Sequence, residues 1–318
     1  RIRALGWHAR LHVHGEDLLA HSDLLRSIKA MPMLIEHFGH VGFMGISAYV
    51  TAILATPIAV KRTALATAPF GLGTVDVPPL VAVAIAILIT LAVAFLVGLM
   101  MVRQAGVPAT IATLAFLVIV HVVVMNWVDL TRGPRGFYGI PAKATIGWAV
   151  AAAVFAIVLA RAFRDSKWGL QLRASSEDMA AASAVGVRIR KLRFAAWMLS
   201  AFIMAVAGAL FTLFVGTISP KSFYFDLTFL TIAMLILGGM HSVTGAVLGC
   251  VIVTVGVEAM RFLESGPAIV GMKLPEMFGL TGFFLGLVIV LSMAFRPSGL
   301  LGADEIDDIW HRRRLRTA

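Results

Sequence analysis

Long apolar runs are the feature of this sequence that most constrains its fold. The segment Pro79–Met101 carries no charged side chain, and seven more segments between Val41 and Phe295 are also strongly apolar. A helix needs about 20 consecutive apolar residues to cross a bilayer, where its own backbone hydrogen bonds replace those to water. Hydrophobic residues make up 59% of the chain and charged residues 14%, against about 45–50% and about 25% in soluble domains. The sequence therefore predicts an integral membrane protein.

We predict an all-α polytopic membrane protein with about eight transmembrane helices. Residues 1–40 contain no apolar run long enough to cross a bilayer and no secretory signal, so we expect an atypical polar N-terminal segment that is disordered or altered. A transmembrane domain over 41–302 and a charged C-terminal tail over 303–318 complete the predicted organisation. The predicted spans are 41–60, 79–101, 108–129, 144–163, 194–216, 226–237, 243–262 and 276–295.

Glycine-rich stretches mark two of these spans, and each stretch has two interpretations. Gly39, Gly42 and Gly45 recur every three residues, which predicts either a smooth face for close helix packing or a broken, re-entrant entry. GGMHSVTGAVLG (238–249) predicts either discontinuous helices or a tight helical hairpin. Composition does not decide between the members of either pair.

The stretch 161–193 is the longest polar interval between two apolar segments. It holds eight Lys or Arg residues and three acids. An even number of predicted spans separates it from the C-terminal tail, so both lie on one side, and that side collects 19 of the 27 Lys and Arg residues. Bases accumulate on the cytoplasmic side of membrane proteins. We therefore expect this loop and the C-terminus to be cytoplasmic. Bases placed between apolar runs follow membrane topology, so no nucleic-acid partner is expected.

The predicted membrane interior offers few groups that could drive transport or catalysis. Asp129, Asp226 and Glu276 fall at span ends and Glu258 lies about a turn from one, so His121 alone titrates near neutral pH close to mid-span. Carriers coupled to protons or sodium usually need carboxylates or broken-helix ion sites at the midplane. The sequence has no phosphate-binding G-x-x-x-x-G-K-[ST] loop and no metal-ligand spacing. We expect no enzyme activity, no cofactor and no metal, and an energy source supplied by a partner.

The middle of the 161–193 loop predicts a short helix. Ser175–Asp178 resembles a helix start, in which a Ser hydroxyl caps the helix and the acids face the positive end of its dipole. Met179–Val185 is rich in Ala, and Gly186 predicts the end of the helix. The bases of 188–193 would hold the loop at anionic membrane lipid. Such a helix either receives another protein on its small-residue face or simply links two spans.

Several stretches together resemble the LivM-type permease of branched-chain amino acid ABC transporters. The pattern E-x-x-A-A-x-x-x-x-G, with Glu177, Ala181 and Gly186, is similar to the cytoplasmic coupling motif of ABC importer permeases. The stretches that carry the resemblance, in family order, are GHVGFMGISAYVTA (39–52), IATLAF (111–116), LTRGPRGFYGIP (130–141), WGLQLRASSEDMAAASAVGV (168–187), SAFIMAVAGAL (200–210), ISPKSF (218–223), LILGGMHSVTGAVLG (235–249) and FRPSGLLG (295–302).

The resemblance implies a permease subunit of an importer in a bacterial inner membrane. Its implied partners are a second related permease, two ATP-binding cassette subunits and a soluble substrate-binding protein on the opposite face. It also implies an apolar span before Gly39, and residues 1–40 depart from that pattern. The implied ATPase-coupling residues are Arg173, Glu177, Ala181 and Gly186.

Two other functions stay open at the level of the sequence. The chain could work alone as a secondary carrier or facilitator of a small solute, which His121 and the glycine-broken spans would serve, or it could be a membrane scaffold. Branched-chain or related small hydrophobic amino acids are the expected substrates of the importer, with urea, short amides and other amino acids as alternatives. The candidate translocation path comprises Gly39, His40, Gly45, His121 and Asn126.

Overall fold

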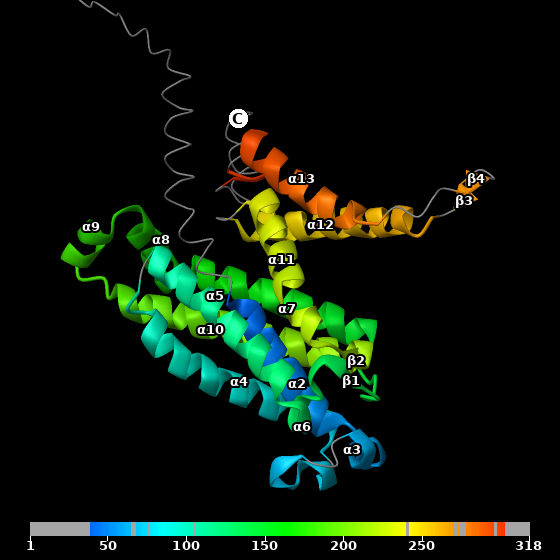
Figure 1. The fold of residues 1–318 in the computed structure, drawn as a ribbon. Helices are drawn as coiled ribbons and strands as arrows, with labels where there is room; N and C mark the ends of the chain where they lie inside the picture. The colour runs from blue at the N-terminus through cyan, green and yellow to red at the C-terminus, as the bar shows by residue number, and fades with distance from the viewer. Residues whose placement is uncertain are drawn as a thin grey trace, which may run out of the picture.

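A computed structural model gives the fold (Figure 1). The residues it describes are 39–64, 68–75, 77–104, 106–239, 242–266, 268–269, 272–273, 278–295 and 298–302. The predictions for the polar N-terminal segment and for the charged tail after 302 lie outside these residues. The described chain is almost entirely helical, which confirms the all-α prediction.

Eight described helices are apolar, in agreement with about eight predicted spans. Those long enough to cross a membrane are α4 (Pro79–Met101), α5 (Val107–Asn126), α7 (Ile146–Asp165), α10 (Ile189–Val215), α11 (Phe225–Gly238, together with the preceding 3-10 turn) and α12 (Val243–Glu264). The two shorter ones are α2 (His40–Ala55) and α13 (Leu280–Phe295).

Short elements connect these helices. The helical ones are α3 (Ile58–Ala64), α6 (Val128–Thr131), α8 (Lys167–Glu177), α9 (Met179–Ala184) and the 3-10 turns η1 (Pro69–Thr74), η2 (Gly133–Arg135) and η3 (Pro220–Phe223). The strands form two antiparallel pairs, β1 (Phe137–Tyr138) with β2 (Thr217–Ile218) and β3 (Ala268–Ile269) with β4 (Met272–Lys273).

Two predicted boundaries are wrong for identifiable reasons. The first predicted span ran to Val60, but α2 ends at Ala55 because Pro57 disfavours helical geometry in the residue before it. The fifth predicted span began at Phe194, but α10 begins at Ile189. Lys and Arg are good helix formers, so the helix continues through the basic residues.

Helix α2 lies at the centre of the bundle and packs against α10, α4 and α5 (Figure 1). It is one continuous helix with most of its residues buried, so its glycines provide close packing rather than a broken entry. At its closest approach to α10, Gly208 lies against the Met44 backbone. Two hydroxyls cross the same interface: Ser47 Oγ donates to Ala205 O at 2.6 Å, and Thr212 Oγ1 donates to Ala48 O at 3.2 Å.

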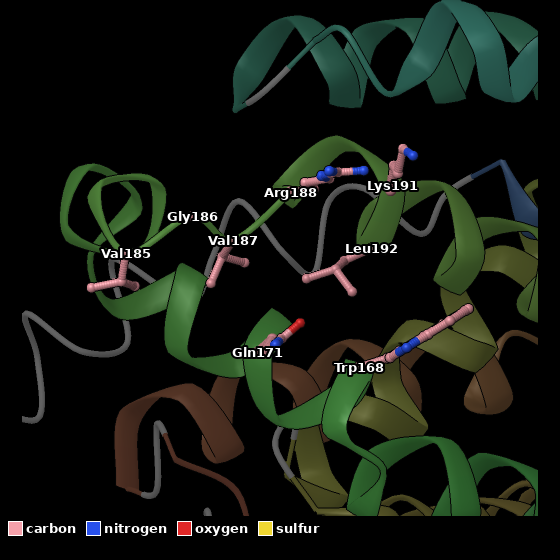
Figure 2. A pocket seen from close by; sticks show the side chains of 8 residues that line it. All are labelled: Trp168, Gln171, Val185, Gly186, Val187, Arg188, Lys191 and Leu192. Carbon is pink, nitrogen blue, oxygen red and sulfur yellow. The ribbon is translucent and has the colours of Figure 1, made fainter.

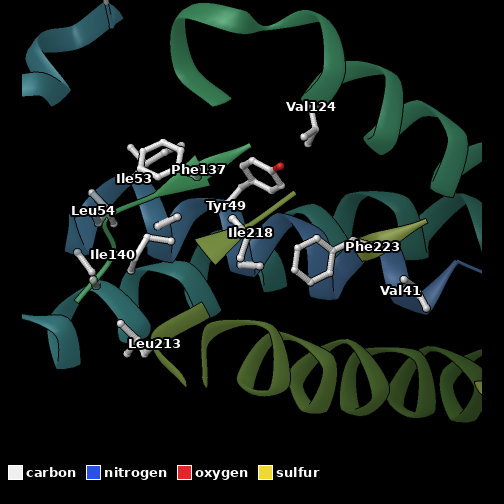
Figure 3. Packing of buried hydrophobic residues seen from close by; sticks show 14 of the residues in the cluster. Val41, Tyr49, Ile53, Leu54, Val124, Phe137, Ile140, Leu213, Ile218 and Phe223 are labelled. Carbon is white, nitrogen blue, oxygen red and sulfur yellow. The ribbon is translucent and has the colours of Figure 1, made fainter. Parts of the chain in front are cut away.

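A cluster of large apolar side chains closes one end of this bundle (Figure 3). Phe137 from β1 and Ile218 from β2 pack there with Tyr49 of α2 and Phe223 of η3. Because the β1–β2 pair joins the connection after α5 to the connection after α10, two loops far apart in sequence form one layer.

Helices α11, α12 and α13 form a second group, in which α11 and α12 are a tight antiparallel hairpin. Gly238 lies against Gly245, and Gly249 against Met234, so the two backbones touch. This arrangement answers the question left open by the GGMHSVTGAVLG stretch. The segment 298–302 completes the group, because the Leu300 amide donates to Leu237 O at 2.9 Å, at the end of α11.

The contact at Gly208 predicts the effect of adding one methyl group. A Cβ at this position would meet the Met44 backbone, including its Cα at 3.1 Å, so Gly208→Ala should force α2 and α10 apart and cost about 1–3 kcal/mol. The midpoint of thermal unfolding in detergent, read by size-exclusion chromatography, should fall. Gly286→Ala on α13 is the control, because a Cβ there meets no atom within 4 Å. Equal midpoints for the two variants would contradict this packing.

Candidate functional site

The polar stretch between α7 and α10 forms a helical surface element, and we call residues 166–188 the coupling segment. Helix α8 follows α7 after one residue, Ser166, whose Oγ accepts from the Gly169 amide at 3.3 Å. Helix α9 follows α8 after one residue, Asp178. The coupling segment lies at one end of the bundle, and the β1–β2 pair lies at the other (Figure 1).

The predicted helix is present, but its start was assigned to the wrong residues. Ser175 and Ser176 lie in the last turn of α8, where their hydroxyls donate to Leu172 O at 2.7 Å and Arg173 O at 2.6 Å. The cap of α9 is Asp178, whose carboxylate accepts from the amides of Ala180 and Ala181 at 2.9 Å each. Asp, like Ser, is a strong N-cap, so the four polar residues gave no way to choose among them.

The end of α9 follows the prediction for Gly186. This residue has a φ of 86°, a left-handed conformation that glycine adopts without steric cost. The Val187 amide then donates to Ala182 O at 3.1 Å and the Gly186 amide to Ser183 O at 3.0 Å, which satisfies carbonyls at the end of the helix. The chain turns sharply here and enters α10.

A cleft of about 370 Å³ opens between α8 and the connection into α10 (Figure 2). Helix α8 supplies Trp168 and Gln171 on one wall, while Val187 and Leu192 point into the cleft from the other. Arg188 and Lys191 lie on this second wall and give it positive charge. This second wall therefore combines apolar side chains with a basic rim. Its full lining is Trp168, Gln171, Val185, Gly186, Val187, Arg188, Lys191 and Leu192.

All four residues predicted to couple to an ATPase are exposed on the coupling segment. They do not meet at one point: Arg173 and Glu177 belong to α8, Ala181 to α9, and Gly186 to the turn after it. Their role in coupling stays a prediction. The sequence did not predict α8 or the cleft beside it. The sequence signal for the start of α8 was Ser166, because Ser is a common helix N-cap.

The candidate translocation residues are spread along α2 and α5. His40 is buried at the start of α2, with its ring centroid 5.2 Å from that of Trp197, and a Cβ on the preceding Gly39 would lie 3.1 Å from Thr113 O. Gly45 faces Phe223 farther along α2. In α5, His121 stacks on Tyr224 at 3.8 Å.

The last candidate, Asn126, is exposed and donates from Nδ2 to Val122 O of its own helix at 2.8 Å. The described structure does not gather these residues around one cavity, and a path along them stays a prediction.

A bundle of apolar helices with a structured helical element at one end is the architecture of a polytopic membrane protein. The chain belongs to the family described as branched-chain amino acid transport system / permease component, whose model matches residues 35–293. This match confirms the resemblance that the sequence motifs indicated.

Relatives of known name agree with this family. The high-affinity branched-chain amino acid transport system permease protein LivM of Escherichia coli (strain K12) is 27% identical over 298 aligned residues, which cover 83% of this chain and 63% of the relative. LivM of Salmonella typhimurium matches to the same extent. The chain therefore spans less than two thirds of the length of these relatives. A probable branched-chain amino acid transport permease protein LivH of Methanocaldococcus jannaschii is 29% identical over 146 residues, or 44% of this chain and 42% of the relative. No solved structure matches the chain.

The cap at Asp178 predicts local stability in the coupling segment. Asp178→Ala removes the acceptor for two amides and should destabilise α9 by about 1 kcal/mol, which corresponds to roughly fivefold faster hydrogen exchange of the α9 amides. Asp178→Asn keeps a capping side chain and should exchange nearly as slowly as the parent. Mass spectrometry of peptides covering 178–187 gives both rates. Identical rates for the Ala variant and the parent would show that Asp178 does not stabilise α9.

Proposed function

We propose that this chain is a transmembrane permease subunit of an ABC importer for branched-chain or related small hydrophobic amino acids. It works in a bacterial inner membrane, with the coupling segment and the C-terminus in the cytoplasm, and separate ATPase subunits drive it. The observation that carries the coupling proposal is the coupling segment itself, a capped pair of surface helices joined directly to two apolar helices. The domain division at 41–302 and 303–318 belongs to the same proposal.

The surface chemistry of the coupling segment supports a protein partner. Trp168 is 58% exposed, Leu170 60% and Val185 80%, although the element lies outside the predicted spans. Exposed large apolar side chains that gather at one surface favour an interface, and Trp168 and Val185 both line the cleft. The basic rim of the cleft, formed by Arg188 and Lys191, adds a place for acidic groups of an ATPase beside this apolar surface.

The connections of the coupling segment explain how a partner could move the spans. Only Ser166 separates α8 from α7, and the turn at Gly186 leads directly into α10. Helix α10 in turn packs along α2 and α4, with Trp197 Nε1 donating to Ala94 O at 2.9 Å. Closure of ATPase subunits against α8 and α9 would rock α7 and α10, and the movement would reach α2 through the contact at Gly208. Alternating access follows if α2 lines the path.

The remaining partners are inferred from the relatives. Escherichia coli has both a LivM and a LivH, and both are named as permease proteins of the high-affinity branched-chain amino acid transport system. This chain is similar to each of them, which supports a second, related permease beside it. Two ATP-binding cassette subunits and a soluble substrate-binding protein complete the proposed importer. The substrate class rests on the names of these relatives.

The turn at Gly186 allows a sharp test of coupling. Gly186→Val places a β-branched residue at a φ of 86° and should strain the turn by about 1–2 kcal/mol, so ATP-dependent leucine uptake should fall roughly tenfold. Glu177→Gln should weaken association of the ATPase in a pull-down from detergent. Both measurements use the complete transporter in proteoliposomes or detergent.

Gly186→Asn is the matched control, because Asn tolerates the left-handed conformation and should keep most of the uptake. Normal uptake and normal ATPase association in both the Gly186→Val and the Glu177→Gln variants would overturn the docking proposal. Leucine uptake by this chain alone, without any ATPase, would favour a stand-alone carrier instead.

A further inference from the structure

The loop LTRGPRGFYGIP (130–141) contains a backbone conformation that needs an explanation. Arg132 has a φ of 64° and is the one non-glycine residue with a positive φ among those the structure describes. Such a conformation costs an L-residue roughly 1–2 kcal/mol, and it concentrates at functional sites. Glycine would occupy this position without strain. We therefore look for the role of this residue in its side chain.

The guanidinium group of Arg132 contacts Tyr138, but one of its nitrogens lacks a hydrogen-bond acceptor among the described residues. Its Cζ lies 4.0 Å above the centroid of the Tyr138 ring, and Nη2 donates to Tyr138 Oη at 2.9 Å. Its Nη1 is buried and donates to no acceptor among the residues that the structure describes. Arg132 also forms no ion pair with a described carboxylate. A covered, charged N–H group without an acceptor is costly, so this arrangement is incomplete without one.

The backbone around Arg132 is firmly fixed, which keeps the guanidinium in place. Thr131 Oγ1 lies 2.6 Å from Val124 O and 2.8 Å from Trp127 O, both at the end of α5. It also accepts from the Gly133 amide at 3.3 Å. Tyr138 belongs to β1, which pairs with β2. The two side chains therefore come from segments that are separately anchored, and their geometry is preorganised.

We propose that Arg132 and Tyr138 form a carboxylate-binding site at the end of the bundle opposite the coupling segment. A guanidinium presents parallel N–H groups that match the two oxygens of a carboxylate, and Nη1 is the donor available for it. Tyr138 is 54% exposed, which places the Arg132–Tyr138 pair at the surface of this end of the bundle. On the predicted orientation this end faces the solute to be imported.

Two sources could supply the carboxylate, one a small molecule and the other a protein. One is the α-carboxylate of a free amino acid, and the other is an acidic side chain of the soluble substrate-binding protein. The second source rests on the proposed function, while the first does not require an ATPase or a second permease. Arg135, three residues away and exposed, is a neighbouring guanidinium without the stacked Tyr and serves as an internal reference.

The experiment measures how fast phenylglyoxal, a reagent for guanidinium groups, modifies each arginine in the full chain held in lipid nanodiscs. Peptide mass spectrometry reports Arg132 and Arg135 separately. The probes are L-leucine, L-leucinamide (which lacks the carboxylate), inorganic phosphate and the purified soluble binding protein. We expect leucine or the binding protein to slow modification of Arg132 at least fivefold, and to change that of Arg135 less than twofold.

The pattern of protection identifies the source of the carboxylate. Protection by leucine but not by leucinamide assigns the α-carboxylate. Selective protection of Arg132 by the binding protein alone assigns an acidic side chain. Equal shielding of Arg132 and Arg135 means simple coverage and overturns the site, as does protection by phosphate alone or by no probe. None of these outcomes depends on ATP-driven uptake, so failure here leaves the coupling proposal standing.

Substitutions give a second, functional readout in the complete transporter. Arg132→Lys keeps the charge but loses the planar pair of donors, whereas Tyr138→Phe keeps the ring and loses the hydroxyl that orients Nη2. We expect uptake at low leucine to fall about tenfold for the Lys variant and less for the Phe variant, with ATPase association unchanged. Arg135→Lys should leave uptake within twofold of the parent. Equal uptake by the Arg132→Lys and Arg135→Lys variants would overturn the proposal.

Discussion

The close contact between α2 and α10 is the interaction on which the rest of this structure depends. In a membrane, lipid tails compete with protein for apolar side chains, so helices associate chiefly through shape and a few hydrogen bonds. Gly208 lets the α10 backbone reach Met44, and the Ser47 and Thr212 hydroxyls bond across the gap. Because α4 and α5 also pack on α2, the position of this one buried helix fixes that of its neighbours.

The two ends of the bundle are stabilised in different ways. At one end the coupling segment is stabilised locally, by the caps at Ser166 and Asp178, and contributes little to the buried core. At the other end, the β1–β2 pair and the cluster around Phe137 tie two loops to the end of α2. Helices α2 and α10, which pack along each other, connect the two ends.

The sequence predicted the features that depend on composition and on local chemistry. Apolar runs located the eight apolar helices of the described chain, because a span has to be apolar along its length. Gly186 marked a helix end because left-handed geometry favours glycine. The sequence could not identify which of several suitable residues caps α9. Ser175 and Asp178 are both good N-caps, and only the position where α8 ends decides between them. The burial of α2 and the cleft beside Trp168 arise from tertiary packing, which no local pattern encodes. The positive φ of Arg132 was not predicted either, because no residue type near it indicates a left-handed conformation.

The segment that follows α13 changes how the last three helices behave mechanically. Its Leu300 amide bonds to the final turn of α11, and Gly299 and Gly302 lie against Gly239, so the chain returns to the turn between α11 and α12. The segment 298–302 therefore adds backbone contacts at the end of α11 to the packing among the three helices. Because α13 also packs directly on α11 and α12, a tilt of α13 would be resisted by its contacts with both helices.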